Sequence, residues 1–144
     1  MITIDALPFS SLDTTTAYAV WKLRQDVFVV EQHCPYADLD GRDDEPGTRH
    51  VVLREGEAVI GYARVLDNAT HWRIGRVVLA ASARGRGLAD ALLETALQVC
   101  PDRDVVLDAQ TPLARWYEAL GFAASGEEFL DDGIPHLPMR RTGR

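Results

Sequence analysis

The segment from Ile74 to Leu97, "IGRVVLAASARGRGLADALLETAL", constrains the fold of this chain more than any other part of it. Its first seven residues are rich in β-branched side chains, which favours a strand. Its last ten residues place apolar side chains at helical spacing and polar ones opposite, which favours an amphipathic helix. A short turn with two glycines joins the two patterns. A strand that passes through such a turn into an amphipathic helix indicates an α/β domain.

Patterns of the same two kinds extend over the rest of the chain. Helical spacing recurs from about Asp13 to Val30, with N-caps offered by the threonines at 14–16, and again in "PLARWYEALGF" at 112–122. Strands are predicted near residues 2–4, as a hairpin over 50–66 with its turn at 55–57, at 74–80, at 104–109, and as a closing hairpin over 127–139 with its turn at 131–133. The predicted order is β-α-βββ-α-β-α-ββ, a single α/β domain over residues 1–144 with a mixed twisted sheet flanked by helices.

Composition and charge exclude several classes of function. The chain has 144 residues and is 47% hydrophobic, which is enough to bury a core without disulfide bonds or structural metal ions. Its net charge of −7 argues against a protein that coats nucleic acid, and no apolar run is long enough to span a membrane. Two cysteines, Cys34 and Cys100, and the lack of a signal-peptide pattern predict a reducing, cytoplasmic location.

The turn in front of the predicted helix has the chemistry of an anion site. A helix N-terminus presents unpaired N–H groups and a partial positive charge. Gly85 and Gly87 remove Cβ atoms that would hinder an anion, while Arg84 and Arg86 suit phosphate oxygens. A P-loop would need G-x-x-x-x-G-K-[ST], which is absent, and a dinucleotide fingerprint would need a third glycine where Asp90 stands. The remaining alternative is a plain tight turn with solvated arginines.

Four segments together resemble the GNAT N-acetyltransferase superfamily. Residues 84–89, "RGRGLA", match its pyrophosphate signature [Q/R]-x-x-G-x-[G/A], and "WYEALGF" at 116–122 is similar to its aromatic helix that ends in Gly-Phe. Residues 27–43 and 129–139 resemble the ElaA-like subgroup of small bacterial GNAT proteins. The segment "DAQTP" at 108–112 departs from the asparagine-containing segment that is usual at this place in the family.

The resemblance implies an acyl-CoA site, with acetyl-CoA as the expected donor and co-substrate. Strand residues are expected to present main-chain groups to the pantetheine arm, with an N–H near Val78 as the oxyanion donor. The turn is expected to hold the pyrophosphate, and Tyr117 to protonate the departing thiolate. The CoA-binding residues predicted in this way are Val77, Val78, Leu79, Arg84, Gly85, Arg86, Gly87, Leu88 and Ala89.

The acceptor is expected to be a small amine or a peptide amine. It attacks the thioester directly, without a covalent enzyme intermediate, so Cys34 is not needed as a nucleophile. An alkyl ammonium has a pKa of about 10.4 and must lose a proton before it attacks, so a base is required. Candidates for the base are Glu31, Asp38, Asp40, His50 and His136, of which Glu31 and His136 are selected. The acidic run at 38–45 either attracts a cationic amine or is a solvated loop.

A second interpretation keeps the CoA pocket without turnover, as a non-catalytic acyl-CoA-binding sensor or interaction protein, and a third is a structural domain with no CoA site. The pyrophosphate motif separates the first interpretation from the third. Only Tyr117 and the base candidates separate the enzyme from the sensor. No metal site is predicted, since "DLDGRDDEPGTR" puts glycine too early and arginine where a calcium loop needs glutamate. No nucleic-acid or membrane partner is expected, and the sequence does not define the oligomeric state.

Overall fold

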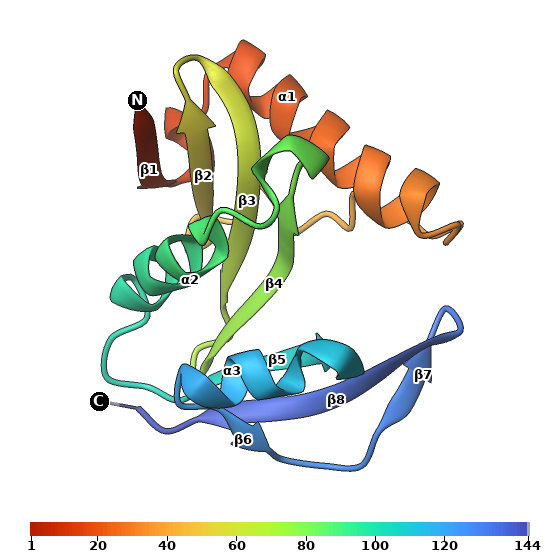
Figure 1. Cartoon of the computed structure of the whole chain (residues 1–144). Helices are drawn as coiled ribbons and strands as arrows, with labels where there is room; N and C mark the ends of the chain where they lie inside the picture. The colour runs from red at the N-terminus through yellow and green to blue at the C-terminus, as the bar shows by residue number, and fades with distance from the viewer. Residues whose placement is uncertain (144) are drawn as a thin grey trace.

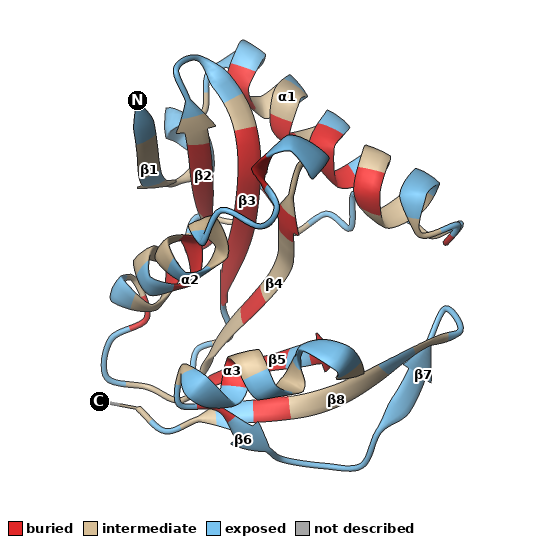
Figure 2. Cartoon of the chain, viewed as in Figure 1, coloured by how far each residue is buried: buried red, intermediate tan, exposed pale blue. Residues whose placement is uncertain are grey.

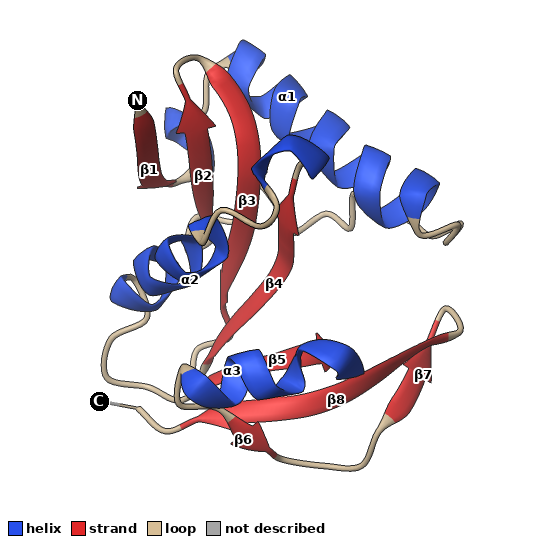
Figure 3. Cartoon of the chain, viewed as in Figure 1, coloured by secondary structure: helices blue, strands red, loops and turns tan. Residues whose placement is uncertain are grey.

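A computed structural model describes residues 1–143 of the chain (Figures 1 and 3). Its strands are β1 (Ile2–Leu7), β2 (Arg49–Glu55), β3 (Ala58–Asp67), β4 (Trp72–Leu79), β5 (Val105–Gln110), β6 (Ala123–Ala124), β7 (Phe129–Asp131) and β8 (Ile134–Arg141). Its helices are α1 (Thr14–Arg24), α2 (Leu88–Gln98) and α3 (Ala114–Ala119), with a π-helix η2 (Gln25–Glu31) and the 3-10 turns η1 (Phe9–Ser11), η3 (Ala81–Ala83) and η4 (Thr111–Leu113). The predicted mixed α/β architecture is confirmed.

The strands form one sheet in the order β1-β2-β3-β4-β5-β8-β6, with β7 paired to β8. Every pairing is antiparallel except that of β4 with β5, which is parallel and joins only Trp72 to Val105 and Arg73 to Val106. Beyond these two pairs the strands diverge, so the sheet opens into two wings (Figure 1). This divergence positions the candidate site.

Helices α1 and α2 cover opposite faces of the first wing. The alternation of side chains along β2 shows why, because Val51 and Leu53 belong to the cluster that α2 packs on, while Val52 belongs to the cluster beneath α1. Leu92 and Leu93 of α2 are fully buried, and Figure 2 shows that buried residues concentrate in β2, β3 and the inner sides of both helices. The predicted amphipathic helix therefore has the predicted face in the core.

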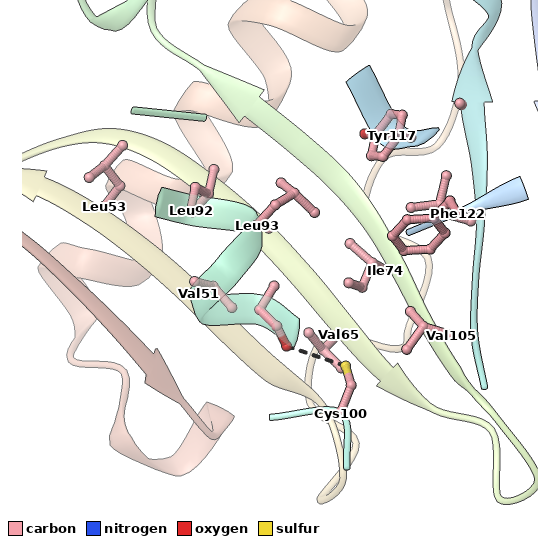
Figure 4. Packing of buried hydrophobic residues seen from close by; sticks show 14 of the residues in the cluster. Val51, Leu53, Val65, Ile74, Leu92, Leu93, Cys100, Val105, Tyr117 and Phe122 are labelled. Atoms are coloured by element: carbon pink, nitrogen blue, oxygen red, sulfur yellow. Dashed lines mark hydrogen bonds between the residues drawn. The ribbon is translucent and has the colours of Figure 1, made fainter. Parts of the chain in front are cut away.

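The cluster under α2 extends into the second wing beneath α3 (Figure 4). Tyr117 and Phe122 meet edge to face there, with their ring centroids 5.9 Å apart. Cys100 Sγ donates to the carbonyl of Ala96 at 3.3 Å, and burial raises the pKa of Cys100 to about 12. Cys100 is thus the small core residue that the helical pattern predicts.

Two helices differ from their predicted extent. The first is α-helical only to Arg24, after which η2 continues with wider turns, as the bond from the Gln32 N–H to the Val27 carbonyl shows (3.1 Å). Its cap is Asp13 rather than a threonine, because the Asp13 carboxylate accepts from the Thr16 N–H at 2.7 Å. The predicted helix at 112–122 is a 3-10 turn followed by the short α3. Apolar spacing over two turns does not distinguish these helix types.

The predicted turns are confirmed where they fall on residues that tolerate a positive φ. The closing hairpin turns at Asp132 and Gly133, whose φ values are 49° and 78°. Gly56 has a φ of 60° in the turn between β2 and β3. Among residues 1–143, no helix combines the length and apolarity that crossing a bilayer requires.

Candidate active site

The divergence of β4 from β5 opens a cleft of about 510 Å³ through the middle of the sheet. One wall comes from η2 and the loop after it, the floor from residues 74–79 of β4 and the end of β5, and the far wall from α3 and the β7–β8 turn. On the cleft side, residues 74–79 have no strand partner among the described residues. Main-chain groups on this edge can therefore bind an extended ligand by strand addition, and the Leu79 carbonyl among them already accepts a hydrogen bond from Arg84.

A β-bulge marks β4 at the cleft. Tyr62 pairs with Val78 and Arg64 pairs with Gly75, so Arg76 and Val77 together oppose a single residue of β3. Arg76 has a φ of 54°, which is unusual for a residue other than glycine. The bulge turns the main chain next to Val78 away from the regular ladder. The N–H groups of this part of β4 are therefore available to a ligand.

The turn between β4 and α2 has the geometry that the glycines predict. Gly85 and Gly87 have φ values of 73° and 72°, a left-handed conformation that favours glycine. A Cβ on either residue would meet no protein atom within 4 Å, so the space in front of both main-chain positions is open. Gly87 is the N-cap of α2 and provides no side chain to the first N–H groups of the helix. N–H groups exposed in this way at the start of a helix can bind an anion, and we refer to this turn and the first turn of α2 as the anion cradle.

Both arginines of this turn are held by glutamates. Arg84 donates from Nη2 to Glu31 at 3.1 Å and from Nε to the carbonyl of Leu79 at 3.2 Å. Arg86 donates from Nη2 to Glu55 at 2.7 Å, at the end of β2. All four side chains of these two pairs are substantially exposed, so an incoming phosphate can compete for either arginine.

Tyr117 lies where α3 meets the cleft, with only 5% of its surface exposed. Burial raises the pKa of Tyr117 to about 12. Its ring packs against Trp116 and Phe122, with centroid distances of 4.7 and 5.9 Å. Its hydroxyl makes no hydrogen bond within the described part of the chain, so it is available to a ligand in the cleft.

The two selected base candidates also line the cleft, from opposite walls. Glu31 ends η2 and is paired with Arg84 as described above. His136 of β8 has Nδ1 2.8 Å from the carbonyl of Ile134, and its ring stacks on Phe129 at a centroid distance of 5.8 Å. The structure thus brings Tyr117, Glu31 and His136 to one cleft together with Val77, Val78, Leu79 and Arg84, while residues 85–89 lie outside the cleft lining.

The acidic loop has a role that the sequence did not predict. Asp38 and Asp43 accept hydrogen bonds from Arg24, whose side chain is completely buried, at 2.9 and 2.7 Å. Arg64 binds Asp40 and Asp43 at 2.8 and 3.1 Å. Arg76 completes the cluster with a 2.9 Å bond to Asp38. These carboxylates hold α1, β3 and β4 together, and they neither form a solvated loop nor remain free for a cationic amine.

The remaining base candidates belong to this cluster. Burial alone would raise the pKa of Asp40, but hydrogen bonds from the Arg64 guanidinium and the Arg42 N–H hold it well below the usual range. His50 is fully buried, its ring nitrogens lie 2.6 Å from the Tyr62 hydroxyl and 2.8 Å from the Asp43 carbonyl, and burial lowers its pKa. None of the three residues Asp38, Asp40 and His50 lines the cleft. Their interactions make them structural rather than basic groups.

Two contacts at the cleft floor were not predicted from the sequence. Arg73, in the last residue pair of β4 and β5, donates to Asp108 at 3.1 Å and so bridges the two strands where they begin to diverge. Gln110 donates to Gln32 at 3.3 Å, which links β5 to the wall formed after η2. The one sequence signal for the first contact was a charged residue, Arg73, at the start of an apolar strand pattern. Among residues 1–143, no group of three or more His, Cys, Asp or Glu side chains is arranged to hold a metal ion.

Comparisons with known proteins agree with this geometry. The model of the acetyltransferase (GNAT) domain matches residues 13–142. The chain therefore belongs to the GNAT acetyltransferase family. Within it, the chain is 38% identical to Escherichia coli ElaA over 148 residues, which cover 98% of this chain and 97% of ElaA. It is 44% identical over 137 residues to a UPF0039 protein of Mycobacterium tuberculosis, covering 92% of this chain and 88% of that protein.

Solved structures share the fold over the full length of the chain. A crystal structure described as an acyl-CoA N-acyltransferase from Pseudomonas aeruginosa superposes with a TM-score of 0.94 at 38% identity and covers 99% of this chain and 100% of that one. The crystal structure of Escherichia coli ElaA superposes with a TM-score of 0.93 at 37% identity, covering 98% and 99% of the two chains. Family and fold support acyltransferase activity and the use of acyl-CoA.

Proposed function

We propose that this protein is an acetyl-CoA-dependent N-acetyltransferase that moves the acetyl group to an amine by direct attack. The observation that carries the proposal is the cleft on the unpaired edge of β4, which Tyr117, Glu31 and His136 line together. Arg84 also lines this cleft and directly precedes the open glycine turn in front of α2, so one ligand could contact the turn, the edge of β4 and the cleft.

The donor end of the path fits CoA by its chemistry. The N–H groups of the turn and the first turn of α2 would bind the pyrophosphate, with Arg84 and Arg86 adding charge. The free edge of β4 at Val77, Val78 and Leu79 would bind the amides of the pantetheine arm. The bulge beside Val78 offers a main-chain N–H to the oxyanion that develops on the thioester carbonyl.

The transfer end needs a base and an acid. The acceptor amine must lose a proton, and Glu31 and His136 are the cleft groups proposed to take it, directly or through water. Attack forms the C–N bond, and collapse of the intermediate breaks the C–S bond. The Tyr117 hydroxyl, held neutral by burial, would protonate the departing thiolate.

A panel of small amines and peptides, incubated with acetyl-CoA and monitored for free-thiol release, tests the proposal. Enzyme-dependent thiol release that requires an added amine, with a matching acetylated product, is the expected result. Binding of acetyl-CoA without turnover of any amine would instead favour an acyl-CoA-binding sensor or interaction protein. Absence of acetyl-CoA binding would contradict both.

Gly87→Glu should abolish the stabilisation that acetyl-CoA confers, because a carboxylate in the cradle blocks and repels the pyrophosphate. Wild-type protein should gain about 2.7 kcal/mol of stability at 100 times the dissociation constant, seen as a higher melting temperature. Gly87→Ala is the matched control, since it carries the same left-handed strain of about 1–2 kcal/mol without the charge. If Gly87→Glu still responds to acetyl-CoA as Gly87→Ala does, the turn is not the pyrophosphate site.

A further inference from the structure

Gly75 is a strand residue at which nothing inside the protein requires glycine. Its φ lies outside the left-handed region, and a Cβ at this position would meet no atom within 4 Å. Gly61 of β3 is different, because its Cβ would lie 2.7 Å from a side-chain atom of Leu53. Glycine within a strand weakens it and often marks a place where a ligand approaches closely. The space above Gly75 is therefore left for something outside the chain.

This space opens into the cleft on the α1 side of the sheet. Gly75 pairs with Arg64, so the two residues face the same way. Tyr62, two positions from Arg64 on β3, belongs to the cluster beneath α1, which fixes the face. Gly75 lies past the last paired residues of β4 and β5 and is part of the cleft lining. We refer to the space above it as the Gly75 hollow.

An arginine with unused hydrogen-bond donors borders the hollow. Arg73 lies two residues before Gly75 on the same face, and its side chain is 36% exposed. Its guanidinium has five N–H donors, yet among the described residues only Nη1 makes a hydrogen bond, to Asp108 at 3.1 Å. Arg64 on the other side is different, because both of its terminal nitrogens are bound by Asp40 and Asp43. Arg73 can thus receive a carboxylate in its fork geometry.

The strand also sets the length of the occupant. Gly75 stands three positions before Val78, where the thioester carbonyl is expected. Because the bulge lies between them, they pair with Arg64 and Tyr62, which are two positions apart on β3, and strand rise makes the separation about 7 Å. A molecule that reaches from Val78 to the hollow is therefore extended. At ~3.3–3.6 Å per residue, a tripeptide spans about 10 Å, which is enough to cross the hollow and approach Arg73, two residues beyond Gly75.

We propose that the Gly75 hollow is the acceptor subsite, and that it takes an extended amine ending in a carboxylate, such as a short peptide, which Arg73 binds. The inference rests on the proposed function, because the amine end of the same molecule is the acetyl acceptor. The amine attacks the thioester carbon and forms the C–N bond, and Glu31 or His136 takes its proton. Collapse of the intermediate then breaks the C–S bond, and Tyr117 protonates the departing thiolate. Gly75 and Arg73 determine which acceptor is bound and take no part in these bond changes.

Trialanine and trialaninamide are the probes, used with the CoA-loaded protein in calorimetry and with acetyl-CoA in the thiol-release assay. Gly75→Ala should leave the melting temperature equal or higher and the Kd for acetyl-CoA unchanged, while the Kd and KM for trialanine rise about tenfold through lost space. Arg73→Gln should remove a preference of about tenfold for trialanine over its amide. Arg140→Gln is the matched control, because Arg140 pairs with Asp104 outside the cleft lining.

Three results would overturn the inference. The first is a Gly75→Ala variant that binds trialanine as the wild type does. The second is a Gly75→Ala variant in which KM rises for butyryl-CoA but not for trialanine, which would make the hollow an acyl-chain pocket. The third is no binding of trialanine to the CoA-loaded wild type. Failure of the proposed function looks different, since the wild type would then bind acetyl-CoA and trialanine but release no thiol.

Discussion

Tyr117 combines two properties that a proton donor needs. Its ring is fixed in the aromatic packing of α3, and its hydroxyl faces the cleft without a partner among residues 1–143. A raised pKa keeps the phenol protonated at neutral and moderately alkaline pH, so the acid form is present whenever a thiolate leaves. At the scale of single residues, the chemistry of the proposed function depends most on this group.

Tyr117→Phe should lower kcat by about 10²-fold while changing the Kd for acetyl-CoA little, because only the departing thiolate uses the hydroxyl. The ratio of wild-type to variant kcat should stay constant from about pH 7 to pH 10, since a pKa of about 12 leaves the phenol protonated over that range. Tyr18→Phe, at an exposed position on α1, is the control. A wild-type advantage that disappears above about pH 9, or equal turnover of both proteins, would exclude Tyr117 as the acid.

Arg84 connects two elements to which the proposed function assigns different substrates. It stands in the turn before α2, where the pyrophosphate is proposed to bind, and its ion pair with Glu31 reaches the end of η2 on the other wall of the cleft. A pyrophosphate and the Glu31 carboxylate would compete for the same guanidinium. Donor binding would then release Glu31 into the cleft, where the proposed function uses it as a base.

Glu31→Gln should therefore tighten acetyl-CoA binding by about two- to fivefold, since an exposed ion pair contributes at most about 1 kcal/mol. Isothermal calorimetry measures the Kd, with Glu57→Gln in the exposed β2–β3 turn as the matched control. The gain should vanish when Arg84 is also changed to Gln, because the competition is then already absent. An unchanged Kd in the single variant, or an equal gain in the Arg84→Gln background, would show that the pair does not oppose donor binding.

The buried ionic cluster acts at the scale of the whole molecule. Arg24 lies on α1, Arg64 on β3 and Arg76 on β4, and the loop that carries Asp38, Asp40 and Asp43 ties them together. The three arginines and three aspartates balance in charge. The cluster fixes α1 and its extension η2 against β4, and so sets the position of the cleft wall on which Glu31 lies.

Asp43→Asn should destabilise the protein by about 3–5 kcal/mol, because it leaves the buried guanidinium groups of Arg24 and Arg64 without their shared carboxylate. Urea unfolding at neutral pH measures the change. Asp44→Asn, at the exposed neighbouring position, should stay within about 0.5 kcal/mol of the wild type. A small effect of Asp43→Asn, similar to that of Asp44→Asn, would mean that the cluster does not support the fold.

Local patterns explain which parts of the molecule could be predicted. The order of elements, the core face of α2 and the glycine turn at 85–87 each depend on residues close together in sequence. The π-helical extension and the brevity of α3 were not predictable, because the same apolar spacing fits several helix types. The open space at Gly75 was not predictable either. A strand glycine that packs closely against a neighbour, as Gly61 does, cannot be distinguished from it in the sequence.

The sequence by itself determined the α/β class, the strand–turn–helix unit and the turn with two left-handed glycines, because spacing and glycine placement act through neighbouring residues. Only the tertiary structure decided that β4 and β5 separate after two pairs, and that the separation opens a cleft. It also decided that the acidic loop is bound by arginines, through ion pairs between residues 14 to 38 positions apart. Such pairs depend on how the elements pack, and a local pattern of charges contains no information about which distant partners will meet it.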